Sequence, residues 1–246
     1  MDNPTYVSLS RQTGLMKEMT AIANNIANAN TTGFKREGAV FTEFVKAAAG
    51  NGTIGSDPQH SLSMGRLGAH VSHFESGGLQ KTGGTLDLAI DGEGFFRIET
   101  PNGERLTRAG HFMTNAEGTM IMPNGYPVLD DGGGQIQIPQ EVNILAIGGD
   151  GTISADGIEI GRLGVVGADP TTLTRQGDNL WQATQGTNEI EFPQLVQGFV
   201  ESSNVEPVNE IARMIEVQRH YDAGQKLLDL ENDRIKGVLT TLRQLA

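Results

Sequence analysis

Residues that could hold a metal ion are present, but their spacing does not suit that role. His70 and His73 are three residues apart in a segment of alternating polarity, so on a strand they point to opposite faces and do not share one zinc ion. Asp87, Asp91 and Glu93 lack the Asp-x-Asp-x-Asp-Gly order of a calcium loop, and we expect them to solvate turns and strand ends. The sequence therefore predicts no metal site.

Motifs for nucleophilic catalysis and phosphate binding are absent as well. The chain contains no Gly-x-Ser-x-Gly, Ser-x-x-Lys, His-Glu-x-x-His or Gly-x-x-x-x-Gly-Lys sequence. No helical pattern follows the glycines of DGEGFF at 91–96, which argues against a phosphate loop. Phe95, Phe96 and Phe112 are expected in the core, and Trp181 has no aromatic neighbours in sequence to support a carbohydrate-stacking site. We expect neither catalytic residues nor a cofactor.

The composition describes an acidic chain without cysteine. Its 246 residues include 30 Asp and Glu and 18 Lys and Arg, a net charge of -12, which argues against nucleic acid as a partner. The absence of cysteine excludes disulfides and thiolate metal sites. No apolar run approaches the roughly 20 residues of a spanning helix, and no signal peptide follows Met1. We expect a protein that is not inserted in a membrane.

The surplus charge lies almost entirely in the middle of the chain. Residues 1–33 hold two acids and two bases, and residues 205–246 hold seven acids and six bases. Residues 34–204 hold 21 acids and 10 bases. A charged middle therefore lies between two nearly neutral ends.

The N-terminal end has the pattern of a helix covered on most of its faces. Residues 19–34 carry no charge, and Gly33 stands where a left-handed cap would end the helix. Its apolar seam consists of Leu15, Met19, Ile22 and Ile26. Asparagine disfavours helix, so we expect amides such as those of Asn25 and Asn28 to bond to neighbouring chains. A buried hairpin within one domain is the alternative.

A second long helix is expected after Ser203 and Glu206, which have the spacing of a capping box. Its heptad seam, interrupted at Gly224 and Glu231, consists of Met214, Val217, Tyr221, Leu228, Ile235, Val238, Leu242 and Leu245. A helix of roughly 40 residues is about 60 Å long. We therefore expect part of the seam to contact other subunits, and a simple intramolecular coiled coil is the alternative.

Between the two ends the apolar period changes to two, as at Leu88 and Ile90, Ile136 and Ile138, Ile158 and Ile160, and Leu163 and Val165. The pairs Asn102-Gly103 and Asp156-Gly157 are turn signals between such strands. These patterns predict an α+β protein in which long terminal helices form a coiled-coil-like domain. The expected parts are an N-terminal helix at 1–33, an extended connecting arm at 34–78, an antiparallel β domain at 79–202 and a C-terminal helix at 203–246.

Four segments resemble the flagellar basal-body rod and hook proteins. They are ANNIANANTTGFKRE at 23–37, DLAIDGEGFFRI at 87–98, LTRAGHF at 106–112 and GFVESSNVEPVNEIARMIEVQRHYDAGQKLL at 198–228. The resemblance covers most of the chain. It implies a helical inner domain made from both termini, an extended arm after Gly33, Phe34 and Lys35, and a β domain outside it.

The resemblance also implies a function. Such subunits stack helically, with themselves and with other rod subunits, into the hollow drive shaft that transmits torque across the periplasm. They pass through the flagellar type III export apparatus, which would explain a chain without a cleaved signal peptide. The seam residues, together with Asn25 and Asn28, would then form the contacts between subunits.

Within the family, the start MDNPTYV, the length and the segment at 138–166 favour a proximal-rod member. A distal-rod member is the close alternative, and a hook protein usually has a longer outer part. Two other classes stay open: an enzyme or sugar-binding module built on the β domain, with the helices as an oligomerisation region, and a cytoplasmic coiled-coil scaffold. Turnover of a substrate would indicate the first, and retention in the cytoplasm would indicate the second.

Overall fold

A computed structural model describes residues 3–47, 61–190 and 192–244. The chain forms two compact units. The first, here called the helical unit, comprises Met1–Ala27, Glu37–His73 and Glu206–Ala246. The second, here called the β unit, comprises Asn28–Arg36 and Phe74–Val205. Helices from both ends of the chain, with antiparallel strands between them in sequence, confirm the α+β class.

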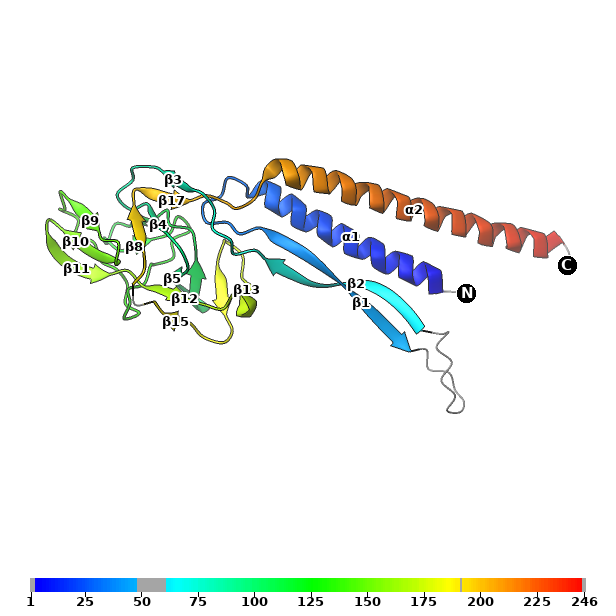
Figure 1. Ribbon diagram of the computed structural model, residues 1–246, viewed down its shortest axis with the longest axis horizontal. Coiled ribbons are helices and arrows are strands. Elements are labelled where there is room, and N and C mark those ends of the chain that lie inside the picture. Colours follow the sequence, from blue (N-terminus) through cyan, green and yellow to red (C-terminus); the bar gives the residue numbers. More distant parts are fainter. Residues whose placement is uncertain (1–2, 48–60, 191, 245–246) are drawn as a thin grey trace. The chain divides into compact units, whose positions relative to one another are not determined.

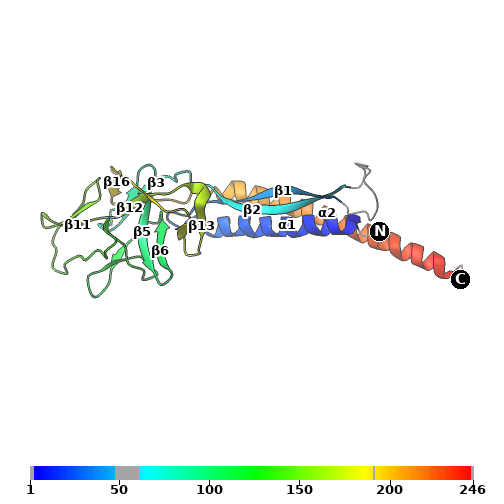
Figure 2. The ribbon, with the colours of Figure 1, turned by 90° about the horizontal axis from the view of Figure 1, so that it is seen from below.

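The helical unit contains two long helices and one pair of strands. Helix α1 (Asn3–Ala27) and helix α2 (Pro207–Gln244) lie side by side (Figure 1). They run antiparallel, because Glu18 bonds to Arg213 while Gln12 bonds to Gln225. Strands β1 (Glu37–Ala47) and β2 (Ser61–Ser72) form an antiparallel pair that packs along α1 (Figure 2).

The predicted seams of the two helices meet inside one chain. Leu15, Ile22 and Val217 form the buried centre of this contact. Met19, Ile26, Met214 and Tyr221 are partly buried against it. The apolar residues identified on each helix are thus covered first by the other helix of the same chain.

Helix α2 is longer than α1, so one end of α2 extends beyond the described residues of α1. Since Gln12 lies opposite Gln225 and the helices are antiparallel, Asn3 at the start of α1 lies near Arg234. Ile235 and Val238 come after that point and are 43% and 50% exposed. The last turns of α2, from 235 to 244, therefore extend past the described part of α1 (Figure 1). This segment is here called the overhang.

The segment predicted as an extended arm contains regular structure. The sequence predicts no sustained period at 34–78, but β1 and β2 pair here over their whole length. The register shifts between Val40 and Phe41, and Gly65 and Gly68 interrupt the alternation of β2. A bulge and glycines remove the period of two by which strands are recognised.

The start of α2 also differs from the prediction. The helix begins at Pro207, and Ser203 Oγ accepts a hydrogen bond from the backbone of Val205 rather than capping the helix. Glu206 precedes the proline, and its carboxylate accepts a hydrogen bond from the side chain of Asn209. The prediction of a Ser203–Glu206 capping box is therefore wrong, because the helix starts later than that motif requires.

The β unit is built from short antiparallel strands. They are β3 (Leu79–Lys81), β4 (Leu88–Ile90), β5 (Phe95–Thr100), β6 (Gly103–Thr107), β7 (Met113–Thr114), β8 (Met120–Ile121), β9 (Leu145–Ile147), β10 (Thr152–Ala155), β11 (Ile158–Arg162), β12 (Val165–Gly167), β13 (Leu173–Arg175), β14 (Trp181–Ala183), β15 (Asn188–Glu189), β16 (Leu195–Gln197) and β17 (Phe199–Glu201). A six-stranded sheet has the order β13-β14-β6-β5-β12-β15, and a three-stranded sheet has the order β11-β10-β9. Three pairs, β16-β4, β17-β3 and β7-β8, complete the unit.

Turn signals and aromatic residues behave as the sequence predicts. Asp156 and Gly157 join β10 to β11 with φ of 50° and 85°, the two positive values of a tight hairpin turn. Phe96 and Phe112 are buried and pack edge to face, 5.2 Å apart. Trp181 is also buried, 4.8 Å from the ring of Phe74. These rings form the core and are not platforms for a ligand.

Not every predicted strand forms. Ile136 and Ile138 are buried, but they lie outside the named strands and are held by single bridges such as that between Thr119 and Gln137. Their period of two reflects burial on one face of the chain, although no continuous ladder of strand hydrogen bonds forms there. None of the described helices is long and apolar enough to cross a membrane.

The buried seam generates a prediction. Replacing Ile22, which is 2% exposed, by Asp places a carboxylate against Leu15 and Val217, and we expect a loss of about 3 kcal/mol or more from the helical unit. Far-UV circular dichroism should show loss of helix at a lower urea concentration. The fluorescence of Trp181, the single tryptophan, should report an unchanged β unit.

The matched control is Met16→Asp, at a site on the same helix that is 58% exposed. It introduces the same charge without burying it, so the urea midpoint should change little. Equal effects of the two substitutions would contradict the packing of α1 against α2.

Candidate functional site

The segment before β1 is inserted into the β unit, and Gly33 makes this possible. The Gly33 N–H donates to the carbonyl of Glu201 over 2.7 Å, and its φ is +64°. A Cβ atom at this position would lie 2.3 to 2.5 Å from the backbone of Arg108 and Ala109. Only glycine fits such a close approach with a positive φ. The positive φ agrees with the prediction, but α1 ends at Ala27, so Gly33 shapes this insertion and does not cap the helix.

The residues that follow Gly33 are among the most buried in the chain. Phe34 is 1% exposed, and the guanidinium of Arg175 lies 4.4 Å from the centre of its ring. Thr32, on the other side of the glycine, accepts a hydrogen bond from the amide of Asn179 over 2.9 Å. The predicted set of Gly33, Phe34 and Lys35 is thus brought together inside the β unit.

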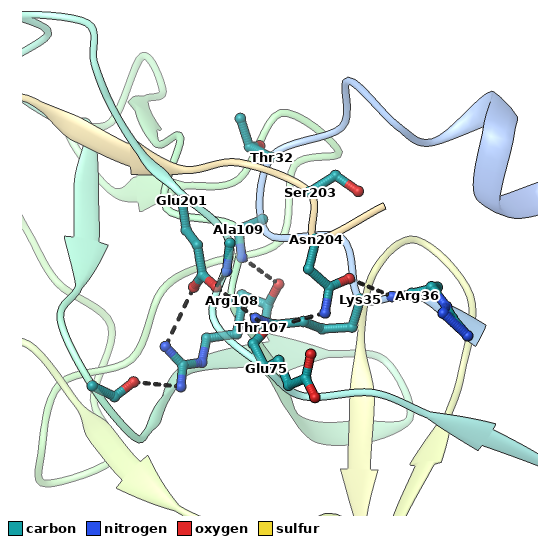
Figure 3. Close-up of polar contacts among 12 residues, drawn as sticks. Thr32, Lys35, Arg36, Glu75, Thr107, Arg108, Ala109, Glu201, Ser203 and Asn204 are labelled. Atoms are coloured by element: carbon teal, nitrogen blue, oxygen red, sulfur yellow. Dashed lines mark hydrogen bonds and ion pairs between the residues drawn. The ribbon is translucent and has the colours of Figure 1, made fainter. Parts of the chain in front are cut away.

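Lys35 enters a charge network with no access to solvent. Its ammonium group donates to Oε1 of Glu201 over 2.5 Å, and Arg108 donates to Oε2 of the same carboxylate over 3.3 Å (Figure 3). The side chains of Lys35, Glu201 and Arg108 are 0%, 1% and 5% exposed. We call these three residues the buried triad.

Further hydrogen bonds fix each member of the triad. Lys35 Nζ also donates to the carbonyl of Glu75 over 2.8 Å, and the Gly77 N–H donates to Oε1 of Glu201 over 2.9 Å. Arg108 donates to the carbonyl of Gly92 over 2.7 Å and lies 5.3 Å from the ring centre of Phe95. The triad therefore holds together segments that are remote in sequence.

Asn204 adds a second link beside the triad. Its amide oxygen accepts the Arg36 N–H over 2.7 Å, and its amide nitrogen donates to the carbonyl of Glu75 over 3.0 Å (Figure 3). The strings GFKR at 33–36 and ESSN at 201–204 thus contact each other directly. These are two of the segments by which the chain resembles a known family.

The triad contains two cations and one anion. This imbalance, together with burial, affects how strongly Lys35 and Arg108 hold their protons. Burial lowers the pKa of the Lys35 ammonium below its ordinary 10.5, and the charge of Glu201 offsets only part of the effect. Burial likewise lowers the pKa of Arg108. A buried net positive charge is costly, and release of a proton relieves it.

In the helical unit, Asn25 has an equivalent linking role. It is 0% exposed, its amide donates to the carbonyl of Glu37 over 2.8 Å, and its oxygen accepts the Glu37 N–H over 2.9 Å. It also donates to Glu210 of α2 over 3.1 Å. Asn25 thus joins α1 to β1 and α2 within the chain, contrary to the expectation that its amide bonds to a neighbouring chain.

The other predicted packing residues fall into three groups. Leu15, Met19, Ile22, Ile26, Met214, Val217 and Tyr221 pack between the two helices, and Asn28 and Leu228 are partly buried. Ile235 and Val238 are exposed on the overhang. Leu242 belongs to α2, but its side chain lies outside the described part of the structure, as does Leu245.

Three exposed aliphatic residues were missed because they lie off the heptad seam. Val208, Ile211 and Ile215 on α2 are 79%, 49% and 47% exposed. Their spacing of three and four residues places them on one helical face. A second apolar face, separate from the seam, is the signal by which the sequence would have identified them. We call these three residues the stripe.

The described part of the structure gathers no set of side chains suited to a metal centre. Among the residues at 3–47, 61–190 and 192–244, no group of three or more His, Asp or Glu side chains is placed to bind a metal ion. The unusual features are instead a buried charge network and uncovered apolar helix surfaces, which are features of a structural and interacting protein.

Comparison with known proteins agrees with these features. Three family models match: the flagella basal body rod protein at residues 6–35, the flagellar hook protein FlgE/F/G D1 domain at 89–155, and the flagellar basal body rod FlgEFG protein C-terminal region at 196–240. The chain is 45% identical over 234 residues to the flagellar basal-body rod protein FlgF of Caulobacter vibrioides, covering 93% of both chains. It is 32% identical to FlgG of Bacillus subtilis, over 97% of this chain and 98% of the relative. FlgF of Rhizobium meliloti is 34% identical over 98% of both.

The imbalance of the triad predicts unequal effects of removing its members. Glu201→Gln leaves two buried cations without an anion and should lower the free energy of unfolding of the β unit by about 3–5 kcal/mol. Lys35→Met leaves the Glu201–Arg108 pair and should cost about 1–2 kcal/mol. Urea unfolding followed by Trp181 fluorescence measures both losses.

A double variant tests whether the charges of Lys35 and Glu201 interact. Combining Glu201→Gln with Lys35→Met removes one of the stranded cations, so it should be less destabilising than the sum of the two single changes. Strict additivity would show that the charges of Lys35 and Glu201 do not interact.

The lowered pKa of Lys35 predicts a pH dependence of opposite sign to that of a simple salt bridge. Between its lowered pKa and 10.5, the unfolded chain binds more protons than the folded chain, so the free energy of unfolding rises with pH in that window. The difference between the wild-type protein and Lys35→Met, measured at several pH values up to 10.5, should therefore increase. A difference that falls with rising pH would mean that pairing with Glu201 outweighs burial.

Proposed function

This chain belongs to the family of flagellar basal-body rod proteins, and we propose that it polymerises as a proximal-rod subunit through the uncovered surfaces of its helices. As a member of the family it is a structural subunit of the basal-body rod and not an enzyme. It assembles with other rod subunits in the flagellar axial structure. The proposal concerns which rod position it takes and which surfaces it uses.

The proximal position is supported by the pattern of similarity. Identity is 45% to an FlgF relative and 32% to an FlgG relative, at similar coverage. The family resemblance links the first with the proximal rod and the second with the distal rod. Export through the flagellar type III apparatus without a cleaved signal peptide, and a final position crossing the periplasm, belong to the same proposal.

The overhang of α2 is the observation that carries the proposed polymerisation. Val217, Tyr221 and Leu228 follow one seam at heptad spacing, and Ile235 continues this seam where α1 no longer covers it. A helix with an uncovered apolar seam gains stability when another helix covers it. We therefore assign the overhang to contact with a neighbouring rod subunit, in a coiled-coil-like inner domain.

The paired strands β1 and β2 are the candidate for the extended arm of the family. Their long antiparallel ladder, from Glu37 paired with Ser72 to Ala47 paired with Ser61, makes an element that is stiffer than an irregular linker. In the proposed assembly this strand pair, and not a structureless segment at 34–78, connects or spaces neighbouring subunits.

The overhang generates a direct test. Ile235→Glu places a charge on the uncovered seam and should abolish rod assembly and swimming motility, because the neighbouring helix would bury that charge. The purified subunit should keep its thermal midpoint, since Ile235 is already 43% exposed. Measurements are motility, the yield of basal bodies, and circular dichroism of the monomer.

Thr240→Glu is the control, because Thr240 is exposed and lies on the opposite side of α2 from the seam. It adds the same charge to the same end of the helix and should leave assembly intact. Motility of the Ile235→Glu strain equal to that of the Thr240→Glu strain would remove the overhang from the assembly interface.

A further inference from the structure

The chain passes between the helical unit and the β unit at four peptide bonds, 27–28, 36–37, 73–74 and 205–206. The residues of the β unit beside these bonds belong to three segments, Asn28–Arg36, 74–78 and 199–205. Every covalent connection between the two units therefore runs through one of these segments. We call them the first, second and third connecting segments.

Hydrogen bonds join each connecting segment to the other two. Lys35 of the first segment donates to the carbonyl of Glu75 in the second over 2.8 Å and to the carboxylate of Glu201 in the third over 2.5 Å. Asn204 of the third segment accepts the Arg36 N–H over 2.7 Å and donates to the carbonyl of Glu75 over 3.0 Å (Figure 3). All of these bonds lie within the β unit, close in sequence to the points where the chain leaves it.

Arg108 joins the connecting segments to the body of the β unit. It donates to Glu201 over 3.3 Å and to the carbonyl of Gly92 over 2.7 Å. It also follows directly after β6, a strand inside the six-stranded sheet. Tension on any one connecting segment is thus passed to the other two and to the sheet.

We propose that the buried triad and Asn204 form a mechanical junction, which makes the three connecting segments share any tension between the two units. This inference rests on the proposed function, because a rod that transmits torque puts its subunits under load. It goes beyond that function by naming the residues that carry the load within one subunit.

The arrangement of the bonds suits this role. Bonds that share a load must break together, whereas bonds loaded one after another break singly. Lys35 and Asn204 each contact both of the other connecting segments, so no single bond is loaded alone. The side chains of Lys35 and Glu201 are 0% and 1% exposed, and a hydrogen bond without competing water is stronger than the same bond in solvent.

Equilibrium stability alone does not account for a charge network at this place. Removing two cations and one anion from water costs free energy, and well-packed apolar side chains of similar volume are often equally stable or more so. Apolar contacts have no fixed direction, so segments that slide past one another exchange such contacts without breaking a bond. Directed hydrogen bonds to both carboxylate oxygens of Glu201 resist that sliding.

Single-molecule stretching of the full-length chain tests the junction. The chain has no native cysteine, so two engineered thiols can carry the DNA handles. Val208→Cys replaces a residue that is 79% exposed in the first turn of α2, beside the third connecting segment. Asn102→Cys lies in the exposed turn between β5 and β6 and applies tension to the sheet. Lys35→Met is then added, because Lys35 lies on a connecting segment that holds neither handle.

We expect the first rupture of the Lys35→Met chain to be about tenfold faster at the same constant force, since bonds to two other segments are lost. Asn204→Ala, which loses its bonds to Arg36 and Glu75, should have the same effect. Unchanged rupture rates of both variants would overturn the proposal.

The matched control is Ile153→Val, a change at a core position of β10 that is 0% exposed. It should lower the urea midpoint by an amount comparable to that of Lys35→Met. The rate of the first rupture should nevertheless stay close to that of the parent chain. Equal acceleration by Ile153→Val and Lys35→Met would mean general destabilisation and no mechanical junction.

Motility under load separates this inference from the proposed function. Cells with Asn204→Ala should build basal bodies in normal number and swim normally in dilute medium, but lose motility at a lower viscosity than wild-type cells. Equal motility of the two strains at every viscosity would contradict the junction and leave the proposed function intact. Failure of the proposed function reads differently: the wild-type protein would then be missing from isolated basal bodies.

Discussion

One buried carboxylate organises the β unit. Glu201 accepts hydrogen bonds from Lys35, Arg108 and Gly77. The free-energy cost of removing this carboxylate from water is offset only if both cations are in place. The fold must therefore bring the segment before β1 and the end of β17 to the same point, and the close approach of Gly33 to Arg108 follows from this requirement.

The helical unit follows a different rule, because it leaves apolar surface uncovered. The seam of α1 packs against α2 within the chain, and Asn25 joins α1 to β1 and to α2. The overhang and the stripe remain exposed. Exposed aliphatic surface of this kind marks a site of interaction, and the helical unit gains stability when an assembly covers it.

Local patterns predicted the elements of this fold but not its long-range pairs. Heptad spacing identified both helices, and Asp156-Gly157 identified a hairpin turn, because those signals lie within a few residues. Lys35 and Glu201 are 166 residues apart, and Asn25 and Glu210 are 185 apart. No periodicity relates such positions, so the triad and the partners of Asn25 could not be derived from spacing. The strand pair β1 and β2 was missed because a bulge and glycines break its alternation.

The unequal lengths of α1 and α2 give the helical unit a direction. An antiparallel pair of equal helices has two similar ends, but here one end is flush and the other is a single protruding helix. The two ends of such a unit therefore differ in structure even before it contacts a neighbouring subunit. A shaft built by repeating it is polar along its axis, so its two ends present different chemistry to whatever is added next.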